Sequence, residues 1–237
     1  MKFYRYLITA FLLVVAFGLA AQSVSANIIR TGQSEPGIFN KATPSASPSL
    51  AVFARSVTNG RSDQVTGVYV QGGKAFPILQ QPASDAGYVS DQPNTLTQFR
   101  MAAQYHTIGL LAHDYLAGAS FQELQAGSEL YLVYGDGRLK NYRVYEVQQF
   151  QALSPSSPYS SFIDLSDQTK LSADQLFYRI YGLGNATLVL QTCISTPSVP
   201  SWGRIFVLAR PVEDPHPAGL WDTLSQFKQS LSGVSAQ

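Results

Sequence analysis

The chain has little cysteine and little charge for its length of 237 residues. A single cysteine, Cys193, cannot form an intramolecular disulfide, so a disulfide-stapled domain is excluded. Charged residues make up 13% of the chain, and 16 basic against 15 acidic residues give a net charge of +1. This balance gives no reason to expect nucleic acid or another polyanion as a partner.

The motifs of the common cofactor-binding classes are also missing. The sequence contains neither a phosphate-binding loop nor a dinucleotide fingerprint. His106 and His113 have no third ligand at the spacing that a zinc site requires. We therefore expect no cofactor and no metal site.

The first 26 residues have the pattern of an export signal. Lys2 and Arg5 precede an apolar run from Leu7 to Ala21, and Val24-Ser25-Ala26 has the small-residue pattern of a signal peptidase site. The run is short for a membrane span, which needs about 20 residues. We predict a cleaved signal peptide over residues 1–26, with an uncleaved membrane anchor as the alternative. Either one places the rest of the chain outside the cytoplasm.

Three further segments follow this signal. Residues 27–50 are rich in Ser and Pro and lack periodicity, which predicts a flexible spacer. Residues 51–214 form the predicted folded domain. Residues 215–237 are predicted to form a helical tail that packs on the domain, because apolar side chains recur there at helical spacing. These side chains are Leu220, Trp221, Leu224, Phe227 and Leu231.

Most of the predicted domain consists of short strand patterns. Val65–Gln71 and Lys74–Leu79 flank Gly72-Gly73, which is a two-residue hairpin signal. Five further segments have strand length: Ile108–Leu111, Leu130–Tyr134, Lys140–Val147, Ala186–Thr192 and Ile205–Ala209. Ala186–Thr192 and Ile205–Ala209 are the most apolar of them and are expected to be central in a sheet.

Two short helices are predicted between the strands. Thr95 with Gln98 and Ser172 with Gln175 have the spacing of a capping box, and Gly182 would end the second helix. Many short strands with two short helices predict a mostly β fold, namely a closed barrel with helical crossovers.

Cys193 is a candidate nucleophile because of its place at the end of an apolar strand. Side chains alternate along a strand, so Leu188 and Leu190 face one way and Cys193 the other. A thiol beside the following loop, which contains Pro197 and Pro200, is expected to reach solvent and substrate. The alternative is a buried, inert thiol, because free cysteine packs like a small hydrophobic residue.

His113 and Arg204 are the residues that a cysteine nucleophile would need. His113 follows the strand 108–111, and an imidazole can accept the thiol proton and later protonate a leaving amine. Arg204 opens the strand after Cys193, and its planar guanidinium suits an oxyanion or a substrate carbonyl. Taken singly, His113 could be an ordinary surface residue and Arg204 could form a surface ion pair.

Together these residues resemble the sortase family. The stretch Leu190-Gln191-Thr192-Cys193, a loop and then Arg204 is similar to the family's TLxTC…R signature, with Val189 in place of its first Thr. Downstream of His113, the segment Phe121–Leu130 is similar to the family's F-x-x-L-x-x-G-[DS]-x-[IL] pattern. The resemblance covers most of the predicted domain. Each motif alone is weak, and their shared order and spacing along the chain make the resemblance specific.

The resemblance implies an eight-stranded sortase-type β-barrel with short crossover helices, and a cysteine transpeptidase. Cys193 would attack the Thr carbonyl of an LPxTG-like sorting signal, His113 would protonate the departing amine, and Arg204 would be the oxyanion or substrate clamp. An amine from the cell wall or a pilin subunit would resolve the acyl-enzyme. The implied partners are therefore surface proteins that bear sorting signals, and the chemistry needs no metal. Some relatives bind calcium, but this sequence has no acidic cluster that indicates it.

Two alternatives to the transpeptidase remain open. One is a secreted β-barrel binding module that has lost activity, although the presence of Cys193, His113 and Arg204 in the expected order counts against it. The other is a hydrolase that resolves the acyl-enzyme with water. The sequence also departs from many relatives at Ala112 and Asp114, which flank His113, and this leaves the subclass and the sorting motif open.

Overall fold

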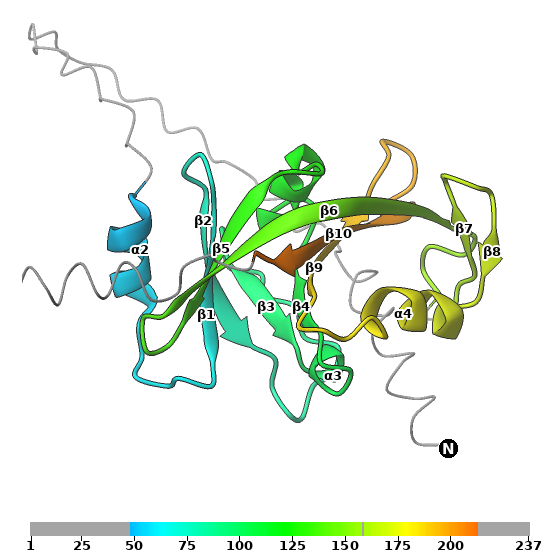
Figure 1. Cartoon of the computed structure of the whole chain (residues 1–237). Coiled ribbons are helices and arrows are strands. Elements are labelled where there is room, and N and C mark those ends of the chain that lie inside the picture. Colours follow the sequence, from blue (N-terminus) through cyan, green and yellow to red (C-terminus); the bar gives the residue numbers. More distant parts are fainter. Residues whose placement is uncertain (1–47, 158, 213–237) are drawn as a thin grey trace, which may run out of the picture.

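The computed structural model describes residues 48–157 and 159–212. They form mostly β structure with a few short helices (Figure 1). The strands are β1 (Val65–Val70), β2 (Ala75–Gln80), β3 (Leu96–Phe99), β4 (Ile108–Leu111), β5 (Glu129–Tyr134), β6 (Leu139–Ala152), β7 (Phe162–Asp164), β8 (Lys170–Leu171), β9 (Leu188–Ile194) and β10 (Gly203–Pro211). The helices are α2 (Leu50–Val57), α3 (Arg100–Ala103), α4 (Ala173–Tyr181) and the 3-10 helix η1 (Ala117–Glu123).

Eight of the ten strands close into a barrel. The strand order is β10-β9-β4-β3-β2-β1-β5-β6, and β10 also pairs with β6, which joins the two ends. β2 with β3 and β4 with β9 are parallel, and the other pairs around the ring are antiparallel. β7 and β8 extend from β6 outside the ring. The predicted closed eight-stranded barrel is therefore confirmed.

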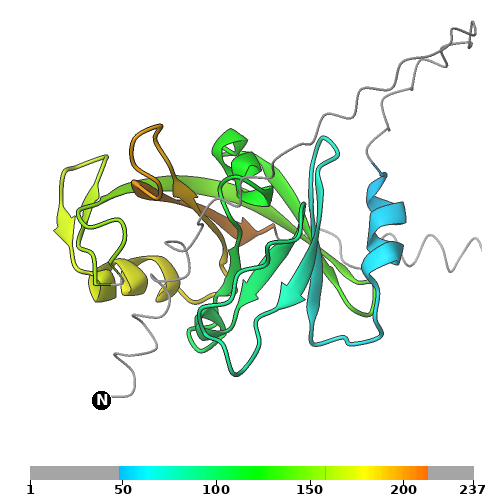
Figure 2. The ribbon, with the colours of Figure 1, turned by 180° about the vertical axis from the view of Figure 1, so that it is seen from behind.

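Alternation along the strands produces two cores, one on each face of the sheet. Leu188 and Leu190 of β9 belong to the cluster that fills the barrel together with residues such as Leu130 and Leu132. Val189, between them in sequence, belongs to a second cluster on the outer face, which α4 and β7 cover (Figure 2). Cys193 has the same parity as Val189, so its side chain belongs to the outer face, as the alternation predicted.

One of the two predicted capping boxes is present. Ser172 caps α4 through the Gln175 amide, the Gln175 side chain accepts from the Ser172 amide, and Gly182 is the C-cap, as predicted. The box predicted at Thr95 and Gln98 is wrong. Residues 96–99 instead form β3, because their backbone groups pair with β2 on one side and β4 on the other. Sheet pairing overrides the local helix signal here, and α3 is only a single turn.

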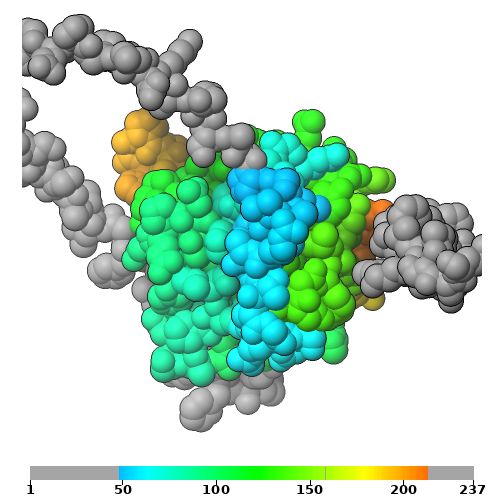
Figure 3. All heavy atoms as spheres, turned by 90° about the vertical axis from the view of Figure 1, so that its left-hand side faces the viewer, coloured from blue at the N-terminus to red at the C-terminus, as the bar shows by residue number. Residues whose placement is uncertain are grey.

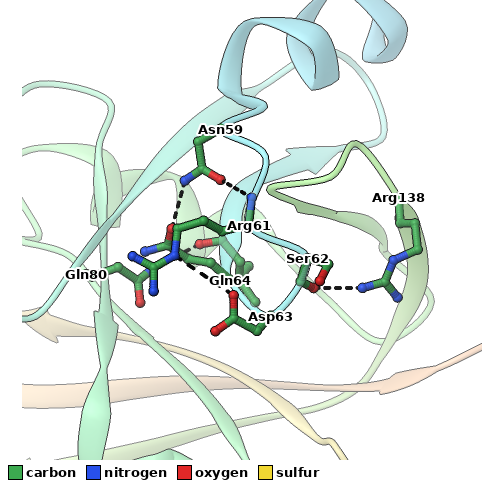
Figure 4. Close-up of polar contacts among 8 residues, drawn as sticks. Asn59, Arg61, Ser62, Asp63, Gln64, Gln80 and Arg138 are labelled. Carbon is green, nitrogen blue, oxygen red and sulfur yellow. Dashed lines mark hydrogen bonds and ion pairs between the residues drawn. The ribbon is translucent and has the colours of Figure 1, made fainter.

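Helix α2, which the sequence did not predict, covers one side of the barrel (Figure 3). Its buried Phe53 packs above Gly67, where a Cβ atom would lie only 2.7 Å from the Phe53 ring. The loop after α2 is tied by hydrogen bonds from Asn59 to Gln64, 2.7 Å, and from Arg138 to the Ser62 carbonyl, 2.7 Å (Figure 4). The chain is thus fastened to the barrel well away from the loop after β9 (Figure 1).

Several predicted segments lie outside the described residues. These are the export signal over 1–26, most of the spacer over 27–50 and the helical tail over 215–237, including Leu220–Leu231. Within the part of the chain that the structure does describe, no helix has the length and apolar character needed to cross a membrane.

Candidate active site

Cys193 lies on a strand whose two neighbours carry the other predicted site residues. Antiparallel pairing of β9 with β10 places Arg204 directly opposite Cys193, and side chains facing each other in such a pair have Cβ atoms about 4.5–5.5 Å apart. Parallel pairing of β9 with β4 aligns Leu111 with Gln191. This is the last pair of that ladder, and His113 and Cys193 each follow two residues later in the chain. The pairings therefore place Arg204 opposite Cys193 and lead the segment that carries His113 to the same end of β9.

Contacts just beyond β4 maintain this alignment. The Ala112 amide donates to the Gln191 carbonyl, 3.1 Å, and the buried Thr192 hydroxyl donates to the Ala112 carbonyl, 2.8 Å. Helix η1 packs against the same place through Gly118, whose amide donates to the His113 carbonyl, 3.0 Å. A side chain at Gly118 would collide with the Thr192 hydroxyl, so this close approach requires glycine.

The Cys193 thiol is completely buried. Burial raises the pKa of this thiol above its ordinary value, and the negative charge of Asp114 adds to the rise. The positive charge of Arg204 and a hydrogen bond from the Ser201 side chain act in the opposite direction but do not cancel the effect of burial. The thiol is therefore protonated at neutral pH, and a thiolate requires a nearby base to take the proton.

Arg204 is also buried, with 1% of its surface exposed. Its Nη1 donates to the carbonyls of Ser201, 2.9 Å, and Gly203, 2.8 Å, and its guanidinium carbon lies 6.0 Å from the centre of the Phe162 ring. Among the described residues, its Nε has no hydrogen-bond partner and no carboxylate forms an ion pair with it. A buried cation without a counter-charge is costly. A negative charge that develops beside Cys193 would compensate it.

The His113 side chain is 12% exposed and has two contacts that the sequence did not predict. Its Nε2 lies 3.2 Å from Asp91 Oδ1, and its ring stacks on that of Tyr115 with centroids 5.1 Å apart. Asp91 lies far upstream, in the connection between β2 and β3, so no sequence pattern pointed to it. Tyr115 is only two positions after His113, so the sequence showed that the two residues are close along the chain but not that their rings stack.

Ser201 is another site residue that the sequence did not indicate. It has a left-handed backbone with φ of 55°, and its amide donates to the Ser195 hydroxyl, 3.0 Å. The loop after β9 thus folds back so that one residue contacts both the thiol and the guanidinium. Pro197 and Pro200 indicated a loop here but not the direction in which it folds.

Two sequence-based expectations need correction. Cys193 was expected to reach solvent at the strand's end, but β9 continues to Ile194, and the thiol is enclosed beneath the loop that ends at Ser201. The alternative of a surface ion pair for Arg204 is wrong, because this side chain is buried on the outer face of the sheet. Both differences arise from the inward fold of the loop after β9.

The other described histidine lies at the opposite end of the same strands. His106 precedes β4, and its carbonyl accepts from the amide of Ala186, which precedes β9. Since β4 and β9 are parallel, His106 and His113 are separated by the length of β4. Within residues 48–157 and 159–212, no three His, Cys, Asp or Glu side chains cluster closely enough to hold a metal ion.

Comparisons with known proteins find similarity only at the level of structure. No family model matches the chain, and no curated protein matches it by sequence. Similar solved structures include sortase C1 of Streptococcus agalactiae (13% identity, 68% of this chain and 74% of that chain, TM-score 0.40). Others are sortase A of Listeria monocytogenes (13%, 63% and 87%, 0.39) and sortase C-1 of Actinomyces oris (12%, 63% and 73%, 0.40). At these identities and TM-scores, the function has to be inferred from the residues of the site.

The first testable consequence concerns the pH dependence of the thiol. Because burial raises the pKa of Cys193, its alkylation by iodoacetamide should be slow at neutral pH and should rise with a midpoint above the ordinary range of a cysteine, about 8.5. Arg204→Met removes the charge that opposes this rise, so it should move the midpoint further up. Arg210→Met, at the end of the same strand, is the control. A midpoint below that of a free thiol in the same buffer would contradict this account.

Proposed function

We propose that this chain is an exported cysteine transpeptidase of the sortase type. The observation that carries the proposal is the Arg204 guanidinium, buried without a carboxylate partner among the described residues and directly opposite the only thiol in the chain. A preorganised positive charge in a water-excluded site stabilises an oxyanion far more than it would in water. Packing alone gives no reason to bury a cation beside a cysteine.

In the proposed reaction, His113 accepts the proton of Cys193, and the thiolate sulfur attacks the carbonyl carbon of Thr in an LPxTG-like sorting signal. The resulting oxyanion faces Arg204. The imidazolium of His113 gives its proton to the departing amine as the C–N bond breaks, which leaves a thioester on Cys193. An amine nucleophile then attacks the thioester, forms a new amide and releases the thiol.

The burial of Cys193 adds one requirement to this scheme. A peptide carbonyl reaches the sulfur only when the loop ending at Ser201, which encloses the thiol, moves aside. Within that loop, Thr196 and Val199 are hydrogen-bonded to each other, the Ser201 amide donates to the Ser195 hydroxyl, and the Ser201 carbonyl accepts from Arg204 Nη1. In the proposed scheme these contacts give way while the ladder between β9 and β10 stays intact.

The proposed partners and location follow from the same assignment. The first substrate is a surface protein with a sorting signal, and the second is an amine of the cell wall or of a pilin subunit. The N-terminal export pattern, with Lys2 and Arg5 before an apolar run, would place the enzyme on the outer side of the membrane, secreted or anchored.

Mass spectrometry of the full chain with an LPxTG peptide tests the reaction. The wild type should gain the mass of the acylated thioester and, with an added amine such as oligoglycine, should release the peptide joined to that amine. Cys193→Ala should show neither product. Cleavage by the alanine variant would rule out the cysteine nucleophile, and release of the free acid despite the amine would identify a hydrolase. Absence of adduct and of cleavage in the wild type would favour the inactive binding module.

The role of the histidine predicts a selective loss. His113→Ala should lower kcat/KM by about a hundredfold to ten-thousandfold, because general acid–base catalysis contributes on that scale. His106→Ala should change it little, since His106 lies at the other end of β4. Peptide cleavage assays measure both. Equal losses from the two variants would mean that the imidazole of His113 has no special part in proton transfer.

Arg204→Lys tests the proposed oxyanion contact. Lysine keeps the charge but loses the planar fork of donors, and loss of one such donor costs on the order of 3 kcal/mol, about a hundredfold in rate. The matched control is Arg210→Lys on the same strand, where Arg210 lies over the Tyr145 ring at 4.1 Å. Turnover of the peptide by Arg204→Lys at the wild-type kcat/KM would exclude the clamp role.

A further inference from the structure

The backbone of His113 is fixed from three sides. Its carbonyl accepts from the amides of Leu116, 3.1 Å, and Gly118, 3.0 Å. The preceding residue, Ala112, is held by the Thr192 hydroxyl, 2.8 Å. With the backbone fixed, the remaining freedom of His113 is the orientation of its ring, and this decides which nitrogen is available for proton transfer.

Two side chains restrain that ring. Asp91 Oδ1 lies 3.2 Å from Nε2, and Tyr115 stacks on the ring face at an interplanar angle of 21°. Tyr115 is 62% exposed, so its ring is not placed there by burial in a core. The Asp91 side chain is 86% exposed and contacts the one edge of the imidazole that carries Nε2.

The backbone on both sides of Asp91 is anchored although its side chain is not buried. Val89 and Ser90 are buried, and the Ser90 amide donates to the buried Thr97 hydroxyl, 2.8 Å. The Gln92 amide donates to the Ser90 hydroxyl, 3.1 Å. Asp91 is thus presented from a fixed turn beside β3, and its carboxylate does not depend on a long, freely moving loop for its position.

We propose that Asp91 is a positioning residue that sets the tautomer of His113. An ionised carboxylate can only accept hydrogen bonds, so a neutral imidazole beside it keeps its proton on Nε2. Nδ1 then carries the lone pair and, under the proposed function, would be the nitrogen that exchanges a proton with Cys193. This inference rests on the proposed function for its catalytic meaning, but the tautomer itself is a property of the folded protein.

Nitrogen-15 NMR of the imidazole rings in the full chain tests the tautomer without any substrate. At a pH where the ring is neutral, the His113 signals of the wild type should be those of the Nε2–H form. Asp91→Ala should shift them toward a mixture of the two forms, and Asp91→Asn, which retains an acceptor oxygen, should shift them less. Asp85→Asn is the matched control, since Asp85 lies in the same connection and accepts from the Gly87 amide.

Peptide cleavage kinetics supply the second measurement. Asp91→Ala should lower kcat about three- to fivefold with little change in KM, because an exposed charged contact is worth about 1 kcal/mol or less. Asp85→Asn should keep the wild-type kcat. Unchanged His113 signals in Asp91→Ala, or a wild-type ring protonated on Nδ1, would overturn the inference even if the enzyme is active. Conversely, an Asp91-dependent tautomer in a protein that never acylates would leave the inference standing and refute the transpeptidase.

Discussion

The pairing of β10 with two strands at once is the constraint on which the rest of the structure depends. On one side β10 pairs with β6 and closes the barrel, and on the other it pairs with β9 and places Arg204 opposite Cys193. The two ladders share the same residues, so the register that closes the barrel also sets the site. A one-residue slip would turn Arg204 into the barrel interior and Ile205 toward the thiol. The same register of β10 therefore determines both the closure of the barrel and the position of Arg204 relative to Cys193.

The electrostatics of the site follow from this shared register. A guanidinium, which ordinarily prefers water, and a thiol able to ionise are both buried and adjacent. Burial disfavours the charged form of the thiol, while the neighbouring cation favours it. The balance leaves the resting site with one positive charge and a neutral sulfur. Under the proposed function, negative charge that forms as thiolate or as oxyanion would compensate this cation, as a site that stabilises a transition state requires.

Residues in regular strands could be placed from the sequence, and residues in loops could not. The apolar runs of β4, β9 and β10 and the hairpin at Gly72-Gly73 have local signals, and the parity of Cys193 followed from simple alternation. The register between β9 and β10 has no local signal, because it depends on closure of the whole ring. Asp91 reaches His113 through a connection that carries no pattern at all. Thr95 gave a false helix signal because pairing with two strands outweighed its capping preference.

The two halves of the site differ in how firmly they are held, and this difference bears on mechanism. Cys193 and Arg204 belong to strands that are paired on both sides, so their separation is as rigid as the barrel. His113, Asp91 and Ser201 lie on turns that a few hydrogen bonds hold in place. Charge stabilisation demands a geometry that stays fixed while an oxyanion forms, and paired strands supply it. In the proposed reaction, substrate entry would therefore displace the loop that ends at Ser201, while the ladder between the thiol and the guanidinium stays intact.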